Sequence, residues 1–258
     1  MNTTMWKYTG QSVIGTSHEK MGIPCQDAHR IEVIDDLLVV VVADGAGSAK
    51  HAEIGAKFIA AETILLIRQW TSFHDDAKDW EAHLSGLVDT LRAQLETKAD
   101  EMKCSVRDVA ATFLLVIVAE SSIAGLQIGD GAIIYGKQNE AEVELLITPE
   151  RGEYLNETVF LTSPNCSFQF AYHDVVADRV AVMSDGLQLI ALDLKIDPPT
   201  PYQTFFRPFF ESLDTVEDNA ERERHLQEFL QSPRVCSRTD DDKTIVFASR
   251  QQRPEFRM

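Results

Sequence analysis

The chain has 258 residues, of which 44% are apolar, and its formal net charge is −17. This acidic composition disfavours binding to nucleic acid or to anionic lipid, because both require basic patches on the protein. No apolar run approaches the roughly 20 residues that a membrane-spanning helix needs, and the N-terminus lacks the basic and apolar regions of a signal peptide, so we expect a cytoplasmic protein without membrane contact.

Strand-like segments open the chain, near residues 9–15, 31–35 and 37–43. Two long helices are predicted next, at about 52–70 and 80–102, because apolar residues recur there near the helical period. The remainder is predicted to be mainly strands, near residues 110–119, 122–128, 131–135, 142–147, 180–184 and 244–249.

A helical excursion of about 197–232 separates the last two predicted strands. It contains an aromatic stretch from Tyr202 to Phe210, which we expect to pack mainly in the core, and a charged helix near 221–230. Since the sequence contains no repeat and no low-complexity linker, we expect one domain over residues 1–258, with a core of about 9–249.

The order of these elements predicts an α+β fold. Strands that follow one another closely in sequence pair antiparallel, and helices then cover the outer faces of the sheets. A Rossmann-type sheet is disfavoured because the alternation of strand and helix that it requires is absent.

Aspartates recur at the ends of the strand-like runs, and glycines beside them allow the backbone to turn sharply. Two carboxylates about 4 Å apart repel by on the order of 4 kcal/mol at an effective dielectric near 20, so a cluster of them requires a cation or protonation. Oxygen ligands without His or Cys favour magnesium or manganese over zinc. The positions concerned are Asp44–Gly45, Gly129–Asp130–Gly131, Asp185–Gly186 and the triplet Asp240–Asp241–Asp242.

The motifs of other phosphate-binding proteins and hydrolases are absent from the sequence. The segment 45–50 matches neither of the glycine-rich nucleotide-binding patterns, and no G-x-S-x-G or H-E-x-x-H motif occurs. None of the four cysteines has an arginine six positions later, and none forms a Cys-x-x-Cys pair. We therefore expect the cysteines to be reduced thiols in or near the core.

An ordered set of motifs resembles the protein phosphatase 2C-like (PPM-type) metal-dependent phosphatases, and more narrowly their small bacterial branch. The set spans nearly the whole chain, and its order is that of the family. The motifs are Gly15–Thr16–Ser17–His18, Pro24–Cys25–Gln26–Asp27–Ala28, Val42–Ala43–Asp44–Gly45–Ala46–Gly47–Ser48, Ala111–Thr112–Phe113, Ile128–Gly129–Asp130–Gly131, Met183–Ser184–Asp185–Gly186 and Thr239–Asp240–Asp241–Asp242–Lys243–Thr244.

The resemblance implies a four-layer α-β-β-α sandwich of two mostly antiparallel sheets, with two Mn²⁺ or Mg²⁺ ions at one end. Asp44 matches the ligand that bridges the ions, and the Gly45 carbonyl matches a ligand of the second ion. The positions of Asp185 and Asp241 match the other carboxylates of the first ion. Asp130 matches a residue that holds a third ion in some relatives. Asp27 matches an acidic residue of the family that acts through water.

The chain departs from the family pattern at several positions. Gln26 stands where the family commonly has a metal-binding glutamate, and Gly22 where an arginine usually binds the phosphate. Ala46 replaces a frequent histidine, and Leu189 a frequent carboxylate. In place of the missing arginine, the candidates for phosphate binding are His18, Lys20 and Lys50.

The first hypothesis is therefore a Mn²⁺- or Mg²⁺-dependent protein-serine/threonine phosphatase, in which a water activated by two metal ions attacks phosphorus without a phosphoenzyme. Its expected partners are phosphorylated proteins, either substrates of a Ser/Thr kinase or the kinase itself. The alternative is a catalytically weak module of the same fold that binds phosphoproteins or regulates a kinase. Hydrolysis of a small phosphorylated metabolite is a third possibility.

Overall fold

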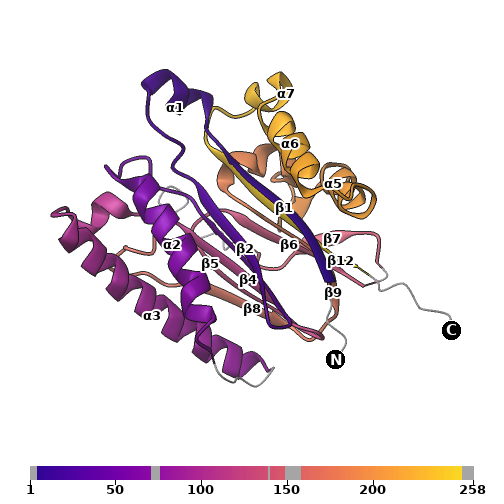
Figure 1. The fold of residues 1–258 in the computed structure, drawn as a ribbon, viewed down its shortest axis with the longest axis horizontal. Coiled ribbons are helices and arrows are strands. Elements are labelled where there is room, and N and C mark those ends of the chain that lie inside the picture. The colour runs from indigo at the N-terminus through magenta and orange to yellow at the C-terminus, as the bar shows by residue number, and fades with distance from the viewer. Residues whose placement is uncertain (1–4, 71–75, 139, 149–157, 252–258) are drawn as a thin grey trace.

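Two five-stranded antiparallel sheets lie face to face in the middle of the molecule (Figure 1). The computed structural model describes residues 5–70, 76–138, 140–148 and 158–251. The first sheet, called here the β1 sheet, has the order β1 (Met5–Val13), β12 (Lys243–Gln251), β9 (Ala177–Met183), β6 (Ala132–Lys137) and β7 (Val143–Leu145). The second, called the β3 sheet, has the order β2 (Ala28–Ile34), β3 (Leu37–Ala43), β4 (Phe113–Val118), β5 (Ile123–Ile128) and β8 (Gln169–His173).

Helices cover the outer face of each sheet, which gives the four layers seen in Figure 1. The β3 sheet is covered by α2 (Ala52–Ile67) and α3 (Ala77–Glu101), and the β1 sheet by α5 (Gln203–Thr215) and α6 (Asn219–Leu230). This arrangement confirms the predicted α+β fold of two antiparallel sheets flanked by helices. The shorter elements are α1 (Thr16–Met21), η1 (Val106–Val109), η2 (Asp185–Leu187), α4 (Gln188–Ala191), α7 (Pro233–Cys236) and the small pair β10 (Leu192–Asp193) and β11 (Thr200–Pro201).

The strand β3 shows why the sequence forms this sandwich. Its alternate residues point to opposite faces of the sheet. Val39, Val41 and Ala43 pack against α2 and α3, whereas Leu38, Val40 and Val42 pack between the two sheets. Because both faces of β3 are covered, the strand is apolar throughout and holds the residue that follows it, Asp44, at a fixed place.

Most predicted elements are present, with shifted boundaries. β1 ends at Val13 because residues 16–21 form the helix α1, and the strand predicted near 142–147 is only three residues long. β8 was not predicted. In the aromatic stretch, Phe206 and Phe210 are buried as expected, whereas Tyr202 is exposed. No helix in the described ranges is both long and apolar enough to cross a bilayer.

Candidate functional site

Predicted site residues from both sheets lie where their strands begin or end. Asp44 follows β3 and Asp27 precedes β2, and these two strands pair with Ala28 opposite Ala43. An antiparallel pair places the start of one strand beside the end of its neighbour. The two aspartates are therefore neighbours at one edge of the β3 sheet.

The β1 sheet contributes carboxylates in the same way. Asp185 comes just after β9, and Asp241 comes just before β12. These two strands pair with each other, and Ile245 lies opposite Met183 in the pair. Ser184 connects the two sheets at this point, because its Oγ donates a hydrogen bond of 2.8 Å to Oδ2 of Asp27. The four aspartates thus belong to one end of the sandwich.

Hydrogen bonds fix the backbone around Asp44. Its N–H donates to Thr112 Oγ1 at 2.9 Å, and its carbonyl accepts from the Thr112 N–H at 2.8 Å. The N–H of Gly45 donates to the Gln26 carbonyl at 3.2 Å. The Asp-Gly turn after β3 is therefore held from both sides, by the loop before β4 and by the segment before β2.

The carboxyl groups of Asp27, Asp44 and Asp185 all have raised pKa values. Burial is the largest cause for each of them. It raises the pKa of Asp27 to about 7, and it raises the pKa of Asp44 well above its usual range, with the nearby charges of Asp27 and Asp185 as further causes. The pKa of Asp185 is raised as well, with repulsion from Asp130 and Asp241 adding to burial. Such a group favours a bound cation, which would offset the repulsion.

Three buried oxygen atoms in this region have no hydrogen-bond partner, namely Oε1 of Gln26, Oδ1 of Asp27 and Oδ1 of Asp185. A buried acceptor without a partner is costly, so these atoms fit a site that receives cations or water. Within the described ranges, the side chains of His, Cys, Asp and Glu do not form a preformed group of three or more metal ligands. A complete set of ligands would therefore include other oxygens, such as the Gln26 amide, the Gly45 carbonyl and water.

Asp242 has a different role from the carboxylates of the site. It is 2% exposed and accepts three hydrogen bonds, from the N–H groups of Gly15 and Gln26, both at 2.6 Å, and from His18 Nδ1 at 3.0 Å. Gly15 must be a glycine here, because a Cβ would lie 2.3 Å from the Asp241 carbonyl carbon. Asp242 thus ties the segment that carries Gln26 and Asp27 to the start of β12.

The residues predicted to bind phosphate lie in unequal surroundings. His18 is buried in α1, and its Nδ1 is bonded to Asp242, whereas Lys20 and Lys50 are exposed. Sequence reasoning missed Lys243, which is fully buried and whose Nζ donates to the Asp241 carbonyl at 3.1 Å. The sequence could have indicated Lys243 as a site residue by its position directly after the aspartate triplet, because a lysine there partly offsets the negative charge of the three carboxylates.

The predicted ligand Asp130 and the thiol of Cys25 both lie near these carboxylates. Asp130 accepts a hydrogen bond of 2.8 Å at Oδ2 from Thr158, and it is close enough to raise the pKa of Asp185. It follows Gly129, whose φ of +106° suits glycine. Burial raises the pKa of the Cys25 thiol, with Asp27 and Asp242 as further causes, so this cysteine remains protonated and is a poor nucleophile.

Comparison with known proteins gives one family. Residues 14–231 match the family model described as "Protein phosphatase 2C". "Serine/threonine-protein phosphatase 3" of Escherichia coli (strain K12) is 34% identical over 252 residues, which cover 94% of this chain and 98% of that protein.

Solved structures agree in fold. Serine/threonine phosphatase Stp1 from Staphylococcus aureus has a TM-score of 0.66 at 15% identity and covers 96% of both chains. PppA, "a key regulatory component of T6SS in Pseudomonas aeruginosa", has a TM-score of 0.65 at 15% identity, covering 96% of this chain and 99% of that one. At this level of identity the similarity concerns the fold alone.

Proposed function

We propose that this chain, which belongs to the protein phosphatase 2C family, hydrolyses phosphoserine and phosphothreonine in proteins with the help of two divalent metal ions. The observation that carries the proposal is the group formed by the buried carboxylate of Asp27 and the half-buried carboxylates of Asp44 and Asp185, all with raised pKa values, at the end of both sheets. Its relative from Escherichia coli is a phosphatase by name, which favours an enzyme over a module that only binds phosphoproteins.

The proposed donor set consists of oxygen atoms, which suits Mn²⁺ or Mg²⁺. Asp44 would bridge the two ions, with Asp185 and Asp241 completing the first site and the Gly45 carbonyl belonging to the second. Gln26 and Asp27 would contribute to the second site, and their unpartnered buried oxygens support this role. Asp130 would serve a weaker third ion.

Bound Mn²⁺ or Mg²⁺ would supply Lewis acidity to the phosphoryl group and lower the pKa of a water molecule. The chain itself would orient the reacting groups. Thr112 fixes the backbone of Asp44, and Ser184 occupies Oδ2 of Asp27, which leaves Oδ1 of Asp27 as an acceptor for a water proton. The proposed contacts of the phosphate remain the ammonium groups of Lys20 and Lys50 and the ring of His18.

The proposed partners are phosphorylated proteins, either substrates of a Ser/Thr kinase or the kinase itself, in the cytoplasm.

We expect the purified protein to release phosphate from phosphothreonine and phosphoserine peptides in the presence of Mn²⁺. This activity should be lost on chelation of the metal and should return when Mn²⁺ is restored. Phosphotyrosine peptides and small phosphorylated metabolites should be hydrolysed at least about tenfold more slowly, a difference of 1.4 kcal/mol in the barrier. Phosphate release that survives complete chelation would contradict the proposal.

The replacement Gln26→Glu tests the second metal site. A carboxylate is a better ligand than a neutral amide, so we expect the affinity of the second, weaker Mn²⁺ site to rise by about tenfold, or 1.4 kcal/mol. Without metal, a further buried negative charge should lower the melting temperature, because its repulsion from Asp27 and Asp44 is not offset. Calorimetry with Mn²⁺ measures the first effect and thermal unfolding in chelator the second. An unchanged affinity would place Gln26 outside the metal's ligand sphere.

A further inference from the structure

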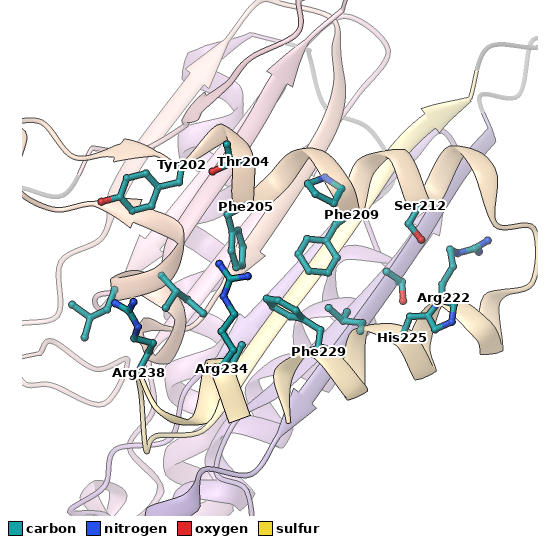
Figure 2. A pocket seen from close by; sticks show the side chains of 16 residues that line it. Tyr202, Thr204, Phe205, Phe209, Ser212, Arg222, His225, Phe229, Arg234 and Arg238 are labelled. Atoms are coloured by element: carbon teal, nitrogen blue, oxygen red, sulfur yellow. The ribbon is translucent and has the colours of Figure 1, made fainter. Parts of the chain in front are cut away.

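A cavity of about 610 Å³ lies outside the candidate site, on the outer face of the β1 sheet. Figure 2 shows α5 along one side of it and α6 with α7 along the other. None of the predicted metal or phosphate ligands lines it. Its volume is within the range of about 300–1,000 Å³ that is typical of sites for small organic molecules.

The wall of the cavity is aromatic and held in place by ring contacts. Phe209 stacks on Phe247 of β12, with ring centroids 4.7 Å apart and an interplanar angle of 20°. Phe229 of α6 meets Phe209 edge to face at 5.0 Å and Phe205 at 6.0 Å. Since each ring is fixed by the others, the apolar surface that faces the cavity is preformed.

The cations at the cavity fall into two groups. Arg222 is already engaged, because its guanidinium donates to the carbonyls of Val216 and Glu217. By contrast, Arg234 and Arg238 have no side-chain hydrogen bond or ion pair with any residue in the described part of the chain, and both are exposed. Figure 2 shows the Arg234 side chain extending from α7 toward the rings of Phe205 and Phe209.

Exposed arginines without an ion pair occur elsewhere in the described part of the chain, for example Arg107 and Arg207, so what distinguishes Arg234 and Arg238 is that both line one cavity with an aromatic wall. A guanidinium pairs well with carboxylate, sulfonate and phosphate groups, so their position beside the cavity favours an anionic group there. A second observation points the same way. Thr9 lines the cavity, is 5% exposed and has no partner for its Oγ1, so the protein leaves a polar atom unused at this place.

We propose that this cavity binds a small amphipathic anion. Its apolar body would lie against Phe205, Phe209 and Phe229, and its acidic group would pair with Arg234 and Arg238. Both features are required, because the aromatic wall alone selects no charge and the arginines alone would bind any exposed anion weakly. The site is distinct from the proposed phosphatase centre and does not depend on it.

The probes for the test are two dyes of similar apolar body, 1-anilinonaphthalene-8-sulfonate and the uncharged N-phenyl-1-naphthylamine, titrated into the full chain in chelator. We expect saturable binding of the sulfonate at one site and binding of the uncharged dye at least about fivefold weaker, or roughly 1 kcal/mol. The double variant Arg234→Gln/Arg238→Gln should lower the affinity for the sulfonate by about tenfold, which is the size expected for loss of a charged hydrogen-bonded pair, and leave the uncharged dye within twofold.

Arg224→Gln is the matched control, because Arg224 lies on the neighbouring helix α6, is paired with Glu228 at 2.9 Å and does not line the cavity. It should bind both dyes as the parent does. Ser212→Trp, which places a large ring into the cavity from α5, should weaken both dyes without changing the melting temperature by more than a few degrees. The proposal is overturned if the two dyes bind equally, if neither binds, or if Arg224→Gln reduces sulfonate binding as much as the double variant does.

Discussion

Replacement of Asp44 by asparagine is expected to lower kcat/KM of the metal-dependent reaction by at least about a thousandfold, or 4 kcal/mol, because it removes the charge of the proposed bridging ligand. The same change should not weaken the fold in chelator. The pKa of Asp44 is raised by burial and by the charges of Asp27 and Asp185, which means that its ionised form is disfavoured in the folded protein. The neutral amide avoids this cost.

The sign of the effect on stability follows from the direction of the shift. A carboxyl group with a raised folded-state pKa contributes stability below its unfolded-state pKa, and this contribution is lost as the pH rises through the folded-state value. At neutral pH and above, the parent protein without metal therefore carries a penalty that Asp44→Asn lacks. We expect the variant to melt at the same or a higher temperature than the parent in chelator, and only the parent to gain stability on addition of Mn²⁺.

Thermal unfolding with and without Mn²⁺ and the phosphopeptide assay measure these effects. Asp36→Asn is the control, because Asp36 is exposed in the turn between β2 and β3, at the other end of the strand that holds Asp44. It should behave as the parent in both assays. If Asp44→Asn retained activity and the shift with Mn²⁺, the bridging role would be wrong.

The apolar runs and the residues at their ends were the part of the structure that sequence predicted well. A run such as that of β3 has few alternatives to a strand covered on both faces, and the residue that follows it, Asp44, then has a fixed place. The ordered motifs indicated the family from sequence alone, and the match over residues 14–231 confirms the resemblance.

The elements that sequence missed lack such a pattern. The strand β8 has only five residues, all of them half-buried, which is too short a run to indicate a strand by itself, and its place is set by pairing with β5. The helix α1 has only six residues and begins inside the motif Gly15–His18. Its position depends on contacts with residues 240–242, which are distant in sequence.

Within the site, sequence reasoning treated the triplet before β12 as one acidic group. The structure separates its members. Asp241 is exposed, and its Oδ1 accepts a hydrogen bond of 2.8 Å from the Asp242 N–H, whereas the Asp242 side chain is buried and accepts from the N–H groups of Gly15 and Gln26. Spacing along the chain could not distinguish them, because adjacent residues point in different directions wherever the backbone enters a strand.

The two adjacent aspartates should therefore differ in what they contribute to stability. Asp242→Ala should lower the free energy of unfolding in chelator by about 3–5 kcal/mol, because it leaves the N–H groups of Gly15 and Gln26 buried without an acceptor and removes the partner of His18. Asp241→Ala should cost only about 1 kcal/mol, because its side chain is exposed and loses the single hydrogen bond that its Oδ1 accepts from the Asp242 N–H, and it should instead weaken Mn²⁺ binding.

Urea denaturation in chelator and calorimetry with Mn²⁺ measure the two quantities on this adjacent pair. Asp242→Asn serves if the alanine variant does not fold, since the amide keeps one acceptor oxygen and should retain part of the stability. Equal destabilisation by Asp241→Ala and Asp242→Ala would mean that the buried carboxylate does not hold the segment before β2. Opposite phenotypes would show that the scaffold of the site and its metal ligands can be altered separately, although they are neighbours in the sequence.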